Sequence, residues 1–90
     1  AVLALDDVLA IGAMREAQRH QLRIPEDIAF IGFNDTPLCS FVEPSLTSVA
    51  IDIAALARAA TQRLIDLIEG RSPSPRRLIV PSRLVPRESA

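Results

Sequence analysis

The chain has 90 residues, of which 49% are hydrophobic and 23% are charged. A chain of this length buries roughly 60–65% of the surface that it exposes when unfolded, so we expect at most one modest core. The net charge is -1, with 10 Arg interspersed among 11 acidic residues and no Trp or Tyr, which argues against a nucleic-acid-binding surface within these residues.

Several other classes of protein are disfavoured by features that the sequence lacks. No apolar run approaches the ~18 residues of a transmembrane helix, and we find no signal peptide at the start of the chain. The single cysteine, Cys39, excludes an internal disulfide framework and favours a reducing cytoplasm. There is no glycine-rich phosphate loop and no metal-ligand pattern, so we expect neither a cofactor nor a metal.

The first part of the chain predicts a strand followed by a helix. Residues 1–5 are apolar, and Asp6-Asp7 predicts a helix start because Asp is a favoured N-cap. The helix should end near His20, and Gly12 within it is typical of a close backbone approach. Its spacing predicts two faces: a stripe of Val8, Ile11, Met14 and Arg15, and a small-residue face of Leu9, Ala10, Ala13 and Ala17 that could lie on a sheet.

The stretch IAFIGFND, residues 28–35, is the most informative of the sequence. Its first four residues form an apolar, β-favouring run without alternation, which predicts a strand buried on both faces, as in a parallel sheet. The residues from Asn34 to Pro37 predict a turn. Ligands of open α/β sheets bind beyond the carboxyl ends of the strands, so Asn34 and Asp35 either lie at a ligand-binding edge or only close the turn.

The second half of the chain predicts a loop, a strand, a helix and two short strands. Residues 38–45 have no clear period and predict a loop with a short helical turn, and residues 46–51 predict a strand. Asp52 should cap a helix whose apolar residues recur at helical spacing and which ends at Gly70. Residues 76–80 and 83–85 predict two further strands, broken by Pro81.

This order of elements predicts an α/β fold with a mostly parallel sheet and right-handed crossovers. Two main helices cannot cover both faces of five buried strands. We therefore expect an incomplete domain, the C-terminal portion of a larger one.

Four stretches follow one another in a familiar order: ALDDVLAIGAMREAQRHQLRIPEDIAFIGFNDTPL, then EPSLTSV, then a helix ending in EG, and finally LIVPSRLVPRES. This pattern resembles the C-terminal part of LacI/GalR-type transcriptional regulators and extends over essentially all 90 residues. The resemblance implies a periplasmic-binding-protein-like type I fold, in which two α/β subdomains bind an effector in the cleft between them. The helix-turn-helix that binds operator DNA lies at the N-terminus of such regulators, outside these residues.

The resemblance also implies roles for individual residues. Asp6, Asn34 and Ile53 match effector-contacting positions of the family. Asp6 stands where the family usually has Asn, and Asn34 stands where it usually has Asp, so the two residue types are exchanged. Ile53 replaces what is often a larger side chain in the cleft. Gln21 stands where Gly commonly ends the first helix, and the left-handed conformation costs roughly 1 kcal/mol there.

The same resemblance predicts a homodimer and a hinge. The family's dimer interface matches Val8, Ile11 and Arg15 on the first helix and the loop at Phe41-Val42. Residues 1–50 and 82–90 would belong to one subdomain, and residues 51–81 would contribute to the other. The chain would cross between them at two hinge segments, Ala50-Ile51 and Pro81-Ser82.

Three functions follow from the sequence, in order of preference. The first is the effector-binding and dimerising region of a cytoplasmic bacterial repressor, which takes a small molecule such as a sugar or nucleoside. The second is a periplasmic-type sugar-binding protein of a transport system. The third is an enzyme such as a carboxylate-pair hydrolase acting through Asp6 and Asp7, which we disfavour because adjacent carboxylates at a helix start are usually caps.

Overall fold

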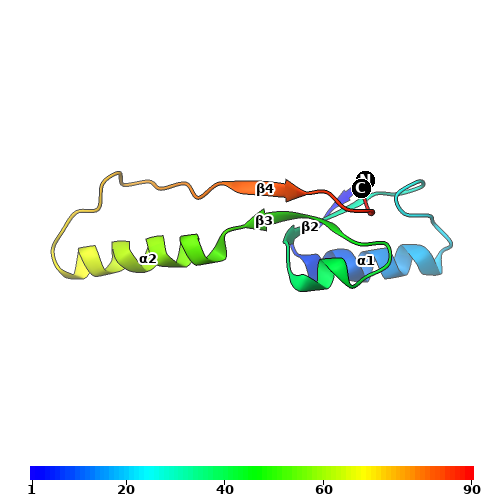
Figure 1. Ribbon diagram of the computed structural model, residues 1–90, viewed down its shortest axis with the longest axis horizontal. Helices are drawn as coiled ribbons and strands as arrows, with labels where there is room; N and C mark the ends of the chain where they lie inside the picture. The colour runs from blue at the N-terminus through cyan, green and yellow to red at the C-terminus, as the bar shows by residue number, and fades with distance from the viewer. The chain divides into compact units, whose positions relative to one another are not determined.

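A computed structural model describes residues 1–90, and the chain divides into two units (Figure 1). Unit 1 comprises residues 1–50 and 83–90, and unit 2 comprises residues 51–82. The elements along the chain are β1 (Val2–Leu3), α1 (Asp7–Arg19), β2 (Phe30–Asn34), the 3-10 helix η1 (Pro37–Ser40), β3 (Thr47–Ile51), α2 (Ile53–Ile68) and β4 (Ser82–Val85).

The strands form one sheet in the order β1-β2-β3-β4, which confirms the predicted α/β fold with a mostly parallel sheet. Strand β2 lies in the middle and pairs in parallel with β1, where Val2 faces Phe30, and with β3, where Ile31 faces Thr47. The expected loop with a helical turn is also present, as η1.

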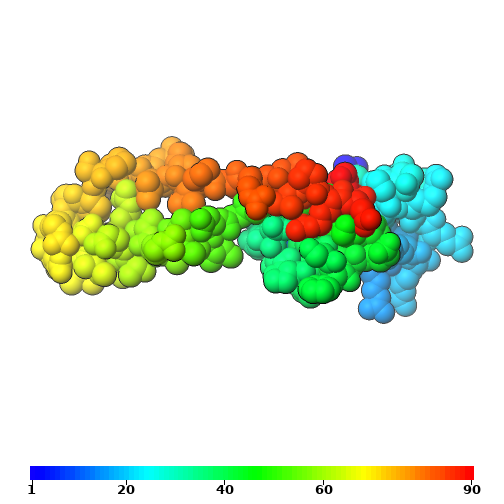
Figure 2. All heavy atoms as spheres, viewed as in Figure 1, coloured from blue at the N-terminus to red at the C-terminus, as the bar shows by residue number.

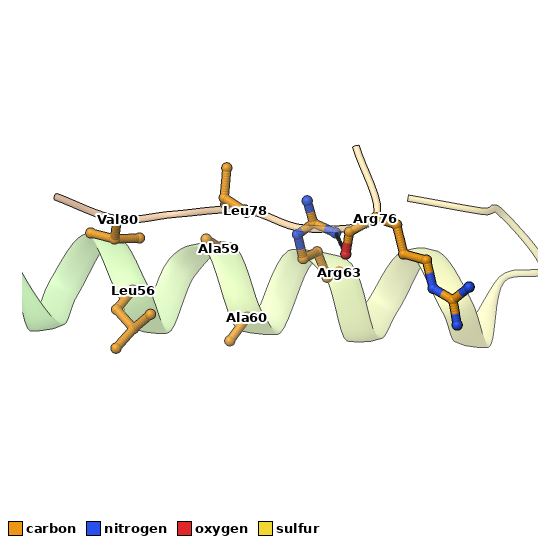
Figure 3. A pocket seen from close by; sticks show the side chains of 7 residues that line it. All are labelled: Leu56, Ala59, Ala60, Arg63, Arg76, Leu78 and Val80. Atoms are coloured by element: carbon orange, nitrogen blue, oxygen red, sulfur yellow. Dashed lines mark hydrogen bonds between the residues drawn. The ribbon is translucent and has the colours of Figure 1, made fainter. Parts of the chain in front are cut away.

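The prediction of a strand over residues 76–80 is wrong. This segment forms no strand, so the sheet has four strands instead of five. Within unit 2 the segment runs alongside α2 (Figure 3). The Arg63 guanidinium donates hydrogen bonds to the carbonyl oxygens of Pro75 (2.5 Å) and Arg76 (3.5 Å). Leu78 and Ile79 of this segment are exposed, so its β-favouring composition corresponds neither to strand pairing nor to burial within this chain.

Helix α1 starts and ends largely as its sequence predicts. The Asp6 carboxylate caps it by accepting a hydrogen bond from the Val8 N–H at 2.7 Å. At the other end the Gln21 N–H donates to the Gln18 carbonyl and the Leu22 N–H to the Ala17 carbonyl, which is a Schellman motif. Gln21 takes the left-handed position of that motif, with φ 62°.

The buried side of α1 differs from the predicted small-residue face. Met14 lies in the core together with Ala10 and Ala17, whereas Leu9 is exposed. Met14 follows Ala10 by four residues and precedes Ala17 by three, so these side chains share one face of the helix. The prediction that Leu9 belongs to the buried face is therefore wrong, because this residue is 62% exposed. Gly12 meets no neighbouring atom within 4 Å, so no close backbone approach exists there within this chain.

The core of unit 1 is small and lies between α1 and the sheet. Its buried apolar members are Ala10, Met14, Ala17, Phe30, Cys39 and Leu46. Four polar residues are buried as completely as these, namely Asp7, Thr47, Ser48 and Ser89. Buried polar groups are costly unless they are hydrogen-bonded, so the partners of these four decide how unit 1 is held together.

The residues after β4 join unit 1 through one of these buried serines. Ser89 Oγ donates to the Phe30 carbonyl at 2.6 Å and accepts from the Thr47 N–H at 2.8 Å, which ties β2 to β3. The neighbouring Glu88 carboxylate accepts two hydrogen bonds from Ser45, each of 2.8 Å. Figure 2 shows this C-terminal segment lying against the residues that precede β3.

Unit 2 consists of α2 and the segment that follows it. Asp52 caps the helix by accepting from the Ala55 N–H, and Gly70 follows its end with φ 75°, as predicted. No residue of α2 is buried. A hollow of about 180 Å³ lies between the helix and residues 76–80, lined mainly by Leu56, Ala59, Ala60, Leu78 and Val80 with Arg63 and Arg76 at one end (Figure 3).

Neither helix has the length and apolar character that crossing a lipid bilayer requires. No group of three or more His, Cys, Asp or Glu side chains is arranged so that it could hold a metal ion.

Candidate functional site

The carboxyl ends of β1 and β2 bring two predicted effector-contacting residues together. Asp6 follows β1 and Asn34 ends β2, and these strands are neighbours in the parallel sheet. The Asn34 side-chain amide lies 3.4 Å from Asp6 Oδ2, while Asp6 Oδ1 caps α1. Asp6 is therefore both a helix cap and a half-buried acceptor beside Asn34, so its two oxygens have different partners.

The turn after β2 has an unusual backbone. Asn34 has φ 102° and Asp35 has φ 54°, and residues other than glycine rarely adopt positive φ values of this size. Asn and Asp tolerate such angles better than other residues, yet each still costs about 1–3 kcal/mol. Two such residues in a row persist only when surrounding contacts hold the turn in place.

Those contacts come mainly from Asp7, whose side chain is fully buried. Asp7 Oδ2 accepts from the Thr36 N–H at 2.7 Å, and Oδ1 accepts from the Ser48 hydroxyl at 2.6 Å. Burial by itself would raise the pKa of this carboxyl, but the hydrogen bonds from Ser48 and Thr36 outweigh it and hold the pKa below its ordinary value. Asp7 therefore stays ionised and joins the start of α1 to the turn after β2 and to β3.

Ser48 extends this network to Asp35. Its hydroxyl oxygen accepts from the Asp35 N–H at 3.1 Å while donating to Asp7, so Asp7 and Ser48 together bind two consecutive backbone N–H groups of the turn. On the other side Arg87 Nη1 lies 2.7 Å from Asp35 Oδ1. This is an ion pair without a well-aligned hydrogen bond, because that buried oxygen has no donor of good geometry.

Two neighbours of Asp7 show how closely it is surrounded. Gly32 faces it from β2, where a Cβ atom would overlap Asp7 Oδ1 and come within 2.9 Å of Leu46 Cδ2. Cys39 is buried beside it. Burial, and to a smaller extent the hydrogen bond to the Asp7 carboxylate, raises the pKa of the thiol. The thiol is thus kept protonated and is not a reactive nucleophile.

The structure gathers only part of the predicted dimer interface. Ile11, Arg15 and Val42 line one hollow of about 310 Å³ on unit 1. Val8 and Phe41 are exposed and lie outside its lining, with 61% and 83% of their surfaces accessible. The third predicted effector contact, Ile53, belongs to unit 2, where it is the exposed first residue of α2.

The boundaries between the units fall after Ala50 and after Ser82. Of the four predicted hinge residues, Ala50 therefore belongs to unit 1, whereas Ile51, Pro81 and Ser82 belong to unit 2.

Sequence reasoning missed Asp7, Ser48 and Arg87. The sequence suggests a helix start at Asp7 and, as a disfavoured alternative, a catalytic carboxylate pair with Asp6, and it indicates for Ser48 only a place in a β-favouring strand. Arg87 lies in the LVPRES stretch and carried no assigned role, yet its guanidinium also donates to the Leu46 carbonyl at 2.9 Å. A serine in the middle of an otherwise buried strand is the one signal that was available, because a buried hydroxyl needs a partner.

The site as a whole is a polar edge without reactive groups. Asp6 offers acceptors, and Asn34 offers both donors and an acceptor. Each oxygen of the buried Asp7 carboxylate already accepts a hydrogen bond from within the chain. Such an arrangement offers hydrogen-bond donors and acceptors of the kind that a hydroxylated molecule can pair with.

Comparison with known proteins identifies the family. The model of the periplasmic binding protein-like domain matches residues 1–90. This chain belongs to that family. The expected resemblance to LacI-type regulators is confirmed as well, because the similar proteins are transcriptional regulators.

Three relatives illustrate the match. The HTH-type transcriptional regulator MalR of Streptomyces coelicolor is 39% identical over 75 residues, which are 83% of this chain and 22% of MalR. The structure of the transcriptional regulator CelR in complex with cellobiose has a TM-score of 0.91 at 32% identity, and the match covers 99% of this chain and 27% of that one. A LacI family transcriptional regulator from Arthrobacter sp. FB24 in complex with lactose has a TM-score of 0.81 at 36% identity, over 97% of this chain and 33% of that one. The chain thus spans about a quarter of the length of the curated relatives that it matches.

Proposed function

We propose that this chain is the effector-binding and dimerising part of a LacI-type transcriptional regulator, with Asp6 and Asn34 contacting a neutral, hydroxyl-rich small molecule. The observation that carries the proposal is the meeting of Asp6 and Asn34 at the carboxyl edge of β1 and β2, where open α/β sheets bind their ligands. Ile53 would contact the same molecule from the other subdomain.

The chemistry of the edge favours a sugar or nucleoside over an anion. An ionised Asp6 accepts hydrogen bonds from hydroxyl groups and repels phosphate, and Asn34 can both donate and accept. The sugars bound by CelR and by the Arthrobacter regulator support this class. Because these similar proteins are transcriptional regulators, they also favour a regulator over the alternative, a sugar-binding protein of a transport system.

The regulatory mechanism would be hinge closure. An effector that contacts both subdomains favours one angle between them, and Ala50-Ile51 and Pro81-Ser82 would be the segments that bend. In a homodimer this angle sets the spacing of the DNA-reading domains, and so couples effector binding in the cytoplasm to operator affinity. Operator DNA would be bound by a helix-turn-helix outside these residues.

An enzymatic function receives no support from the arrangement of the carboxylates. Both oxygens of Asp7 already accept hydrogen bonds, and its side chain is fully buried. It therefore cannot exchange protons with a substrate beside Asp6, as a carboxylate-pair hydrolase would need.

The effector site is tested by calorimetric titration of the full-length protein with cellobiose, lactose and adenosine, with glucose 6-phosphate as the anionic comparison. We expect at least one neutral compound to bind and the phosphate ester not to bind. Asp6→Ala should weaken that binding roughly tenfold to a hundredfold, because a hydrogen bond to a carboxylate is worth about 1.5–3 kcal/mol. Asn34→Ala removes a neutral hydrogen bond worth about 0.5–1.5 kcal/mol and should weaken binding roughly twofold to tenfold. Unchanged affinity in both variants would leave Asp6 as a cap and Asn34 as a turn residue.

The homodimer is tested at Ile11, which is half-buried in the hollow that Arg15 and Val42 also line. Ile11→Asp would place an unpaired charge in the proposed interface, so the full-length protein should sediment as a monomer at micromolar concentration. Ile11→Val keeps the site apolar and should remain dimeric. A dimer that tolerates the aspartate would rule out this surface as the interface.

A further inference from the structure

We infer that Asp7 and Ser48 are positioning residues for effector binding: together they hold the turn after β2 in the conformation that presents Asn34. The inference rests on the proposed function and deepens it, because neither residue reaches the molecule that Asn34 would contact. It assigns a role to two buried polar residues that packing alone does not explain.

The first step is the energy of the turn. With Asn34 at φ 102° and Asp35 at φ 54°, the backbone leaves β2 in a conformation that an unrestrained chain would abandon. The Asn34 side chain can face Asp6 only while this conformation lasts, since its direction is fixed by the backbone from which it projects.

The second step is the set of contacts that oppose this relaxation. Asp7 binds the Thr36 N–H directly and the Asp35 N–H through the Ser48 hydroxyl. Both N–H groups directly after Asn34 are therefore held from one buried carboxylate. Hydrogen bonds to an ionised acceptor are about twice as strong as neutral ones, and burial removes the competition from water.

The third step is the placement of Asp7 itself. It is the first residue of α1 and follows Asp6 directly, so the same helix start carries the carboxylate that faces Asn34 and the one that holds the turn. Asp6 and Asn34 thus depend on one anchor for their relative position. A displacement of Asp7 would therefore move Asp6 and Asn34 apart.

The chain contains a matched control for Ser48, namely Ser89. Both serines are fully buried, and each hydroxyl donates one 2.6 Å hydrogen bond and accepts one from a backbone N–H. Ser89 bonds to Phe30 and Thr47, at the opposite end of β2 from the turn. Both substitutions should therefore destabilise the protein, Ser48→Ala by more because its acceptor is the Asp7 carboxylate, whereas only Ser48→Ala frees the turn.

The experiment uses the full-length protein and two measurements. Amide hydrogen exchange at Asp35 and Thr36, without any sugar, should become roughly tenfold faster in Ser48→Ala and stay unchanged in Ser89→Ala. Titration with cellobiose and lactose should show binding weakened about tenfold in Ser48→Ala and within about twofold of the parent in Ser89→Ala. Asp7→Asn should resemble Ser48→Ala, and the double variant should lose less than the product of the two single losses, because both residues act through one network.

The outcomes separate this inference from the proposed function. If the parent binds a sugar and Ser48→Ala binds it as tightly as Ser89→Ala does, the positioning role is overturned and the function stands. If the parent binds neither these sugars nor adenosine, the proposed effector class fails, and amide exchange at Asp35 and Thr36 then decides whether Asp7 and Ser48 hold the turn. Unchanged exchange in Ser48→Ala would then overturn the role of the pair in holding the turn, and faster exchange would support it.

Discussion

Replacing Gly32 by Ala should destabilise the protein strongly, although alanine is usually the better residue for a strand. The backbone of Gly32 does not have a positive φ, so alanine is conformationally allowed and would by itself gain about 0.5–1 kcal/mol. The new Cβ, however, would overlap Asp7 Oδ1 and approach Leu46 Cδ2 to 2.9 Å. Overpacking a core costs about 1–3 kcal/mol, and a displaced Asp7 would also lose charged hydrogen bonds worth about 1.5–3 kcal/mol.

We therefore expect a net loss of about 2–4 kcal/mol in the free energy of unfolding, measured by denaturant titration of the full-length protein. A double-mutant cycle identifies the cause. In an Asp7→Ala background the overlap with the carboxylate is absent and only the close approach to Leu46 Cδ2 remains, so Gly32→Ala should cost less there.

Gly70→Ala provides the control for this cycle. Gly70 has φ 75° and open space around it, so alanine should cost about 1 kcal/mol in either background. A Gly32→Ala protein as stable as the parent, or a cost that is the same with and without Asp7, would refute the packing of β2 against this carboxylate.

Three further predictions follow from the same features. Gln21→Gly should raise the free energy of unfolding by about 0.5–1 kcal/mol, because Gln21 has φ 62° in the Schellman motif of α1, and a neutral or destabilising result in denaturant titration would contradict that geometry. Because the pKa of Asp7 is lowered in the folded state, its ionisation contributes stability that is fully present above pH 3.8, the ordinary pKa of the group, and is lost as the pH falls through the folded-state pKa. In an acid titration the free energy of unfolding should therefore fall less steeply for Asp7→Asn than for the parent. The 90 residues in isolation should not melt cooperatively, since no residue of α2 is buried and many large apolar side chains are exposed, and a sharp calorimetric transition without association would exclude this.

The elements with their own local signals were predicted well. Asp6 and Asp52 cap the two helices because their carboxylates accept from backbone N–H groups two and three residues ahead, and Gly70 ends α2 with the positive φ that glycine favours. These outcomes depend on a few neighbouring residues, which is why the sequence alone was sufficient. The fold class followed from the order of such elements.

The errors concern contacts between residues distant in sequence. Residues 76–80 have a strand-like composition, but only the rest of the structure decides whether a strand pairs with them. Ser48 and Asp7 are 41 positions apart, and nothing near either residue indicates that they bond. Proximity of Asp6 to Asn34 was predictable from parallel strands, whereas the positive φ of Asn34 and the carboxylate behind it were not.

The discontinuity of unit 1 has a consequence for synthesis on the ribosome. Residues 1–50 contain β1 to β3, yet β2 and β3 are tied at one end by Ser89, which is made only after the whole of residues 51–82. Until then the Phe30 and Thr47 N–H groups lack their partners in the C-terminal segment, and β3 is an edge strand because its neighbour β4 has not yet been made. Unpaired strand edges are prone to wrong association during folding. A translational pause within residues 51–82 would therefore prolong the time during which the nascent chain can associate wrongly through β3.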